Sequence, residues 1–152
     1  MPTLTTFMTF DSQAEEAANL YLSIFEEGKI TSIQRAGDKV FGLTLELLGR
    51  TMFFMNGGPT FTFSQGFSLF VACDTQAEID RYWGKLTDNG GKEVQCGWLV
   101  DRFGVSWQIV PRIMTELLGS KDPVKSKRTM QAMMKMVKLD IAALKRAHDG
   151  EA

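Results

Sequence analysis

The chain has 152 residues, a formal net charge of −1 and charges of both signs spread along its length, so it is about one domain in size and lacks the basic footprint of nucleic-acid-binding proteins. Its apolar runs, such as residues 51–55 and 67–73, are far shorter than the roughly 20 residues that a membrane-spanning helix needs. The N-terminus also lacks the pattern of an export signal, and together these features predict a cytoplasmic protein without nucleic-acid or membrane partners.

The first half of the chain is predicted to form a strand, a helix and three further strands. Residues 4–10 are rich in Thr and Phe and favour a strand, and residues 14–25 carry apolar side chains at helical spacing. Glycine-containing turns then separate three strand patterns, and Asn56-Gly57-Gly58-Pro59 interrupts regular structure after the last of them. The three strand patterns cover residues 30–36, 40–48 and 51–55.

The second half repeats this order, and a short motif marks the repeat. Asp11-Ser12-Gln13-Ala14-Glu15 recurs as Asp74-Thr75-Gln76-Ala77-Glu78, in both places between a strand pattern and a helical pattern. Ser12 with Glu15, and Thr75 with Glu78, have the spacing of a helix capping box. The repeat predicts a duplicated βαβββ arrangement of eight strands and two helices, with a cleft between the halves that could hold a small ligand. The elements of the second half are expected at 67–73, 76–86, 93–96, 97–100 and 105–110.

After Pro111 the pattern becomes purely helical. Residues 112–118 favour a short helix that ends at Gly119, and Asp122-Pro123 is a typical start for a longer one. This longer helix is expected either to pack on its own domain or to join a subunit interface, where methionines are common. Its apolar stripe comprises Met130, Met133, Met134, Val137, Ile141 and Leu144.

Familiar catalytic and cofactor-binding patterns are mostly absent from the sequence. The single histidine, His148, lies in a polar C-terminal tail, which argues against a histidine metal site or a Ser-His-Asp triad. Neither residues 56–59 nor residues 89–91 lead from a strand into a helix as a nucleotide-binding loop does. Cys73 and Cys96 lack metal or redox spacing and are expected to be free thiols. We therefore predict no cofactor and no bound metal.

A few polar side chains interrupt the apolar strands and could orient a ligand. Gln108 offers both hydrogen-bond donors and an acceptor, and Ser68 and the threonines of the first strand offer hydroxyl groups. Glu46 is the one carboxylate inside a predicted strand, so it could serve as an acid or base. Each of these groups could instead face solvent or neighbouring backbone.

Large aromatic side chains are concentrated near the two closing strands and residues 56–59. Some must belong to the core, but their number leads us to expect that several line an apolar pocket. They are Phe53, Phe54, Phe61, Phe63, Phe67, Trp98, Phe103 and Trp107.

Several segments of the sequence together form a specific set. They are Phe10-Asp11-Ser12-Gln13-Ala14-Glu15-Glu16-Ala17, Asn56-Gly57-Gly58-Pro59, Cys96-Gly97-Trp98-Leu99 and Asp101-Arg102-Phe103-Gly104-Val105-Ser106-Trp107-Gln108-Ile109-Val110-Pro111. In this order they resemble the PhnB-like branch of the vicinal oxygen chelate superfamily, which includes glyoxalase I, bleomycin resistance proteins and extradiol dioxygenases. The resemblance implies an α+β fold in which two βαβββ modules form an open barrel-like cleft, and usually a homodimer. We place the modules at about 1–59 and 66–111, in one domain of residues 1–111, and a C-terminal helical extension at 112–152.

The resemblance also implies where a metal would bind. Enzymes of the superfamily place a histidine on the first strand of each module and a glutamate on the last strand, and the matching positions here resemble Leu4, Ser68 and Gln108. The counterpart on the last strand of the first module is either Phe53 or Asn56. Because none of these is a histidine or a carboxylate, the metal-dependent chemistry of the superfamily is not expected. Relatives of this branch often carry the label 3-demethylubiquinone-9 3-methyltransferase, but no segment resembles an S-adenosylmethionine site.

We therefore expect a protein that binds a small apolar or aromatic molecule in an aromatic-lined cleft without a metal, as a homodimer. One alternative is a superfamily enzyme, a lyase, isomerase or dioxygenase, which uses either a weakly bound metal or no metal, with Glu46 or another carboxylate as base. A second alternative is a methyltransferase whose cofactor site the sequence does not reveal. The expected ligand-binding residues are Thr6, Phe53, Asn56, Ser68, Trp98, Phe103, Trp107 and Gln108.

Overall fold

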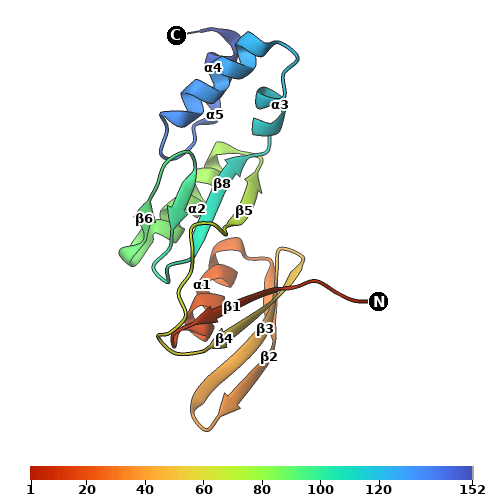
Figure 1. Cartoon of the computed structure of the whole chain (residues 1–152), viewed down its shortest axis with the longest axis vertical. Helices are drawn as coiled ribbons and strands as arrows, with labels where there is room; N and C mark the ends of the chain where they lie inside the picture. The colour runs from red at the N-terminus through yellow and green to blue at the C-terminus, as the bar shows by residue number, and fades with distance from the viewer. Residues whose placement is uncertain (152) are drawn as a thin grey trace. The chain divides into compact units, whose positions relative to one another are not determined.

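The computed structural model describes residues 1–151 and divides the chain into two compact units, which meet in sequence between Thr62 and Phe63 (Figure 1). Each unit contains one four-stranded sheet, and the C-terminal helices belong to the second unit. Within residues 1–151, the structure contains no helix with the length and apolar character needed to cross a membrane.

The first unit is a βαβββ module, as predicted. It comprises β1 (Thr6–Phe10), α1 (Ala14–Phe25), β2 (Gly28–Ala36), β3 (Lys39–Leu47) and β4 (Arg50–Asn56). The strands lie in the order β1-β4-β3-β2, with β1 parallel to β4 and the other neighbours antiparallel. Since side chains alternate between the faces of a strand, one face of this sheet carries the buried Met8, Phe54 and Leu45 beneath α1, and the opposite face carries Phe7 and Phe53.

The start of α1 differs from the predicted capping box of Ser12 and Glu15. The residue that precedes the helix is Gln13, which makes no side-chain capping bond, so Ser12 lies one position too early to cap. Asn56, at the end of β4, replaces it: its Oδ1 accepts a hydrogen bond from the Ala14 amide at 2.8 Å, and its Nδ2 donates to the Val40 carbonyl oxygen at 3.0 Å. One side chain therefore satisfies a free amide of the helix and joins it to the sheet.

The second unit repeats the module. It comprises β5 (Leu69–Cys73), α2 (Gln76–Thr87), a short 3-10 turn (Asp88–Gly90), β6 (Lys92–Glu93), β7 (Trp98–Val100) and β8 (Ser106–Pro111), with strand order β5-β8-β7-β6. Here the predicted capping box is confirmed, because the Glu78 amide donates to Thr75 Oγ1 at 3.1 Å and the Thr75 amide donates to Glu78 Oε1 at 3.0 Å. The predicted fold class, two βαβββ modules with a helical extension, is confirmed.

Within residues 112–151 the C-terminal extension forms three helices, and the prediction of one long helix after Pro123 is wrong. They are α3 (Met114–Leu118), α4 (Pro123–Met134) and α5 (Ile141–Asp149). Between α4 and α5 the backbone bonds to the loop before β7: the Cys96 amide donates to the Met136 carbonyl oxygen and the Gly97 amide to that of Val137, both at 2.8 Å. Gly97 allows this approach because it has a φ of +84° and a Cβ there would lie 2.8 Å from Leu139 Cδ1.

The side chain of Gln76 holds the same segment to α2. Its Nε2 donates to the Leu139 carbonyl oxygen at 3.0 Å, and its Oε1 accepts from the Ile141 amide at 2.8 Å. Asp140 then caps α5 by accepting from the Ala143 amide at 3.0 Å. Because the segment is fixed in this way, Leu139 is completely buried in a cluster at the end of the second sheet. The other buried members of this cluster are Val110, Met114, Leu117 and Leu144.

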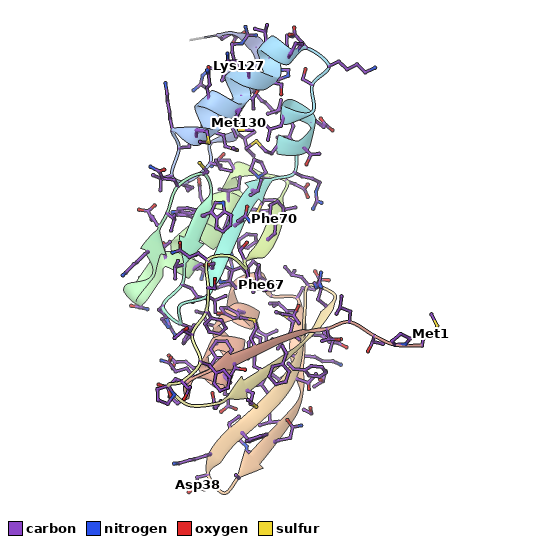
Figure 2. The ribbon with its side chains drawn as sticks, viewed as in Figure 1. Met1, Asp38, Phe67, Phe70, Lys127 and Met130 are labelled. Carbon is purple, nitrogen blue, oxygen red and sulfur yellow. The ribbon has the colours of Figure 1, made fainter. Side chains whose placement is uncertain are left out.

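The apolar stripe predicted for the extension is therefore divided. Met133 packs against the buried cluster, which matches packing of the extension on its own domain. Met130 and Met134 are exposed on α4 in this single chain, and Figure 2 labels Met130 there. A subunit interface at these methionines stays a prediction.

The first prediction concerns Asn56. Replacement by Ala removes both the acceptor for the Ala14 amide and the donor to Val40, so Asn56→Ala should lower the free energy of unfolding by roughly 1–3 kcal/mol. Ser12→Ala is the matched control, and it should change the free energy by less than about 0.5 kcal/mol because Ser12 does not cap the helix. Urea unfolding followed by circular dichroism measures both values. An equal or larger loss in Ser12→Ala would contradict the capping assignment.

The second prediction concerns Gln76. Gln76→Ala removes both bonds to the segment between α4 and α5, so the amide of Ile141 should exchange with solvent about tenfold faster, the factor expected for about 1.4 kcal/mol of lost local stability. Hydrogen exchange followed by NMR or mass spectrometry measures this rate. Gln95→Ala changes an exposed glutamine of the same unit and should leave the exchange unaffected. Unchanged protection of Ile141 in Gln76→Ala would show that the clamp does not hold the segment.

Candidate functional site

The two faces of the second sheet differ in what covers them. On one face, Leu99, Trp107 and Ile109 are buried together with the apolar side of α2. Alternation places Phe70, Gln108 and Trp98 on the opposite face, and the strand register sets these three side by side, with Gln108 between the other two. Phe70 keeps 59% of its surface exposed, and Figure 2 shows it on this sheet.

A cavity of about 440 Å³ lies between this open face and the C-terminal extension, within the size range of small-molecule sites. The extension supplies much of its wall, and residues after Pro111 were not among the predicted site residues. The only sequence signal for them is the apolar stripe of the extension, which does not say what it packs against. The lining residues are Phe70, Ala72, Cys96, Trp98, Gln108, Val110, Pro111, Arg112, Met114, Thr115, Leu118, Met133 and Leu139.

A polar pair lies on this face. Gln108 Nε2 donates a hydrogen bond to Ser68 Oγ at 2.9 Å, and both side chains are half-buried. The bond uses one amide N–H and one lone pair of the hydroxyl oxygen, and it leaves the Gln108 carbonyl oxygen as an acceptor and the Ser68 hydroxyl hydrogen as a donor. The pair can therefore orient a carbonyl, hydroxyl or amide group of a ligand.

Two of the predicted aromatic site residues lie away from the cavity. Trp107 is only 2% exposed, on the face toward α2, and its Nε1 donates to Asp101 Oδ2 at 2.9 Å. Phe103 lies in the turn between β7 and β8, where the Arg102 guanidinium carbon is 4.9 Å from the centre of its ring. Asp101 also accepts from the Phe103 and Val105 amides at 2.9 and 3.0 Å, so Trp107 and this turn form one structural unit.

The predicted site residues of the first unit do not share one surface. Thr6 lies two residues before Met8 and therefore on the same, helix-covered face of the first sheet. Phe53 lies on the opposite face, where its side chain is 38% exposed and its ring centre is 6.2 Å from that of Phe7. Asn56 uses its amide to cap α1 and to bind the Val40 carbonyl. Thr9 lies on the same face as Phe53 and Phe7, opposite to Thr6.

A second, wider cavity of about 690 Å³ lies in the first unit, near the start of α1 and the turn between β2 and β3. Charged groups of both signs surround it, and Arg35 is already paired with Glu15 at 3.1 Å. This lining suits solvent better than an apolar ligand. The cavity of the second unit is therefore the stronger candidate site.

The residues at the positions where the resemblance implies metal ligands do not fit a tight metal site. Ser68 and Gln108 are neutral and bonded to each other, and Leu4 is fully exposed. Within residues 1–151, no three His, Cys, Asp or Glu side chains group closely enough to hold a metal ion. Divalent ions prefer carboxylate, thiolate or imidazole ligands, so we derive no chemistry through a metal here.

The two cysteines have different surroundings. Cys73 is buried against α2, and desolvation raises the pKa of its thiol to about 12, with Glu78 and Asp74 adding to the rise. Cys96 is half-buried, lines the cavity and has a φ of 59°. Because the thiolate is the reactive form of cysteine, Cys73 is protected both by burial and by its pKa.

Comparison with known proteins identifies relatives of this geometry. A family profile described as 3-demethylubiquinone-9 3-methyltransferase matches residues 2–110. The PhnB protein of Bacillus cereus, which carries the same methyltransferase description, is 33% identical and aligns over 72% of this chain and 99% of its own, with a TM-score of 0.67. The curated proteins gave no match.

More distant solved structures share the fold alone. A Pseudomonas aeruginosa protein is 20% identical and aligns over 73% of this chain and 98% of its own, with a TM-score of 0.60. The fosfomycin resistance protein FosX of Mesorhizobium loti is 12% identical over 78% of this chain and 98% of its own, with a TM-score of 0.59. The profile match and the Bacillus cereus relative show that the chain belongs to the 3-demethylubiquinone-9 3-methyltransferase (PhnB-like) family.

Proposed function

We propose that this protein binds a small, largely apolar or aromatic molecule in the cavity between the open face of the second sheet and the C-terminal extension. The observation that carries the proposal is the Gln108 side chain, which lines a mostly apolar cavity of about 440 Å³ and is oriented by its hydrogen bond to Ser68 beside the cavity. Binding sites for small molecules combine an apolar lining with a few polar groups in this way.

The lining accounts for both affinity and orientation. Apolar surface removed from water contributes about 25 cal/mol per Å², and Phe70, Trp98 and Leu118 offer such surface to a ligand. Trp98 adds an aromatic face on which a planar ring can stack. A hydrogen bond from the ligand to Gln108 or Ser68 contributes about 0.5–1.5 kcal/mol, which is small beside the apolar term but decides which way round the ligand binds.

The residues around the cavity favour binding over acid–base catalysis. Among the residues that the structure describes, the lining contains no carboxylate and no imidazole, whereas general acid–base catalysis needs such a group within hydrogen-bond reach of the reacting atom. Glu46, the base considered in the enzyme alternative, lies on β3 of the first unit and is exposed. A methyltransferase would need a site for a methyl donor such as S-adenosylmethionine, which contains a ribose. Nucleotide sites commonly bind the ribose hydroxyls with an acidic residue, and the described lining residues include none.

The third prediction uses the cysteines to report on the cavity. N-ethylmaleimide should label Cys96 in the native protein and leave Cys73 unmodified at pH 8, since Cys73 is buried with a pKa of about 12. A molecule that occupies the cavity should slow the labelling of Cys96, which peptide mass spectrometry measures. In urea both cysteines should react. Preferential labelling of native Cys73 would contradict these assignments.

The fourth prediction fills the cavity. Ala72 lines it from β5, so Ala72→Trp should reduce the affinity for the neutral fluorophore N-phenyl-1-naphthylamine at least about tenfold, because the added ring takes the place of the probe. Ala77→Trp is the matched control, since it makes the same change at an exposed position of α2. Fluorescence titration measures both affinities, and near-UV circular dichroism checks the fold. Equal affinity in wild type and Ala72→Trp would refute the proposed site.

A further inference from the structure

We propose that the ligand of this cavity carries a carboxylate or a comparable anionic group, and that Arg112 binds this group at the mouth of the cavity. The inference rests on the proposed function and adds the chemical class of the ligand. Its first support is the charge of the lining, where Arg112 is the one charged side chain among the lining residues that the structure describes.

The backbone and the side chain of Arg112 are both held in place. Its amide donates to the Cys73 carbonyl oxygen at 2.7 Å, which fixes the residue beside the end of β5. Its Nε donates to Asp74 Oδ1 at 2.9 Å, and its Nη2 donates more weakly to the Ala72 carbonyl oxygen at 3.4 Å. A guanidinium group has five N–H donors, so the two hydrogens on Nη1 and one on Nη2 are available to bind a carboxylate in the bidentate geometry that arginine favours.

Asp74 does not prevent this binding. The Arg112 and Asp74 side chains keep 65% and 69% of their surface exposed, and an ion pair so open to solvent contributes little stability. Asp74 is also not part of the cavity lining. Asp74 occupies only the Nε edge of the guanidinium group and leaves Nη1 open. Its negative charge still repels a bound anion, so its removal should strengthen anion binding.

The two polar ends of the cavity set the length of the ligand. Gln108 and Arg112 are four residues apart along β8 and its continuation, so their Cα atoms are separated by about 13 Å at 3.3 Å per strand residue. The surface between them is apolar and includes Ala72 and Val110, which are paired in the register of β5 and β8. This arrangement fits a molecule with a flat or extended apolar body, an anionic group at one end and a hydrogen-bonding group at the other.

A pair of fluorescent probes that share one skeleton isolates the anionic group. 1-Anilinonaphthalene-8-sulfonate carries a sulfonate, and N-phenyl-1-naphthylamine has the same aromatic body without it. The fifth prediction is that Arg112→Gln weakens the binding of the sulfonate probe at least about fivefold and changes the binding of the neutral probe less than about twofold. Asp74→Asn should act in the opposite direction and strengthen sulfonate binding about two- to threefold, again without an effect on the neutral probe.

Controls separate this proposal from a general charge effect and from the proposed function. Arg50→Gln makes the same change of charge on β4 of the first unit and should leave both probes unaffected. If Arg112→Gln weakens both probes equally, or weakens neither, the anion site is refuted even when Ala72→Trp has confirmed the cavity. If Ala72→Trp leaves the binding of the neutral probe unchanged, the proposed function itself fails, and an Arg112 effect on the sulfonate probe would then mark a surface contact outside the cavity.

Discussion

The cavity depends on one glutamine side chain. Gln76, in the first turn of α2, donates to the Leu139 carbonyl oxygen and accepts from the Ile141 amide, and so fixes the non-helical segment between α4 and α5. Leu139 lines the cavity and is completely buried, so the position of this wall follows from the clamp. Without it, the backbone groups at residues 139 and 141 would have to find other partners, and the segment would be held only by its bonds to the Cys96 and Gly97 amides and by the ion pair of Lys138 with Asp80.

The two modules solve one structural problem in different ways. In both, the last strand lies parallel to the first, with Phe10 opposite Asn56 in the first module and Cys73 opposite Pro111 in the second. The first module uses the Asn56 amide to cap its helix, whereas proline has no side chain that could do so, and the second module uses Thr75 and Glu78. The next residues make the same backbone bond, from Gly57 to Phe10 and from Arg112 to Cys73. Gly57 of the first module therefore corresponds to Arg112 of the second, which lines the cavity.

The proposed site uses this difference between the modules. The second sheet contributes a neutral hydrogen-bonding pair, Gln108 and Ser68, and the extension encloses the apolar face beside it. The methyltransferase description belongs to the family profile and to the Bacillus cereus relative. A shared fold does not by itself imply a shared activity. What the site can do follows from its lining, which can enclose an apolar molecule, orient a polar group and attract an anion.

The sequence by itself determined the duplicated βαβββ order, the capping box of α2 and the family, because these depend on local patterns of apolar spacing, capping residues and turns. It also indicated Gln108, Ser68 and Trp98, which do meet on one face. Only the tertiary structure decided that Trp107 is core, that Asn56 caps α1 and that the extension encloses the cavity. These outcomes depend on strand register and on bonds between residues far apart in the chain, where a shift of one residue reverses the face that a side chain occupies.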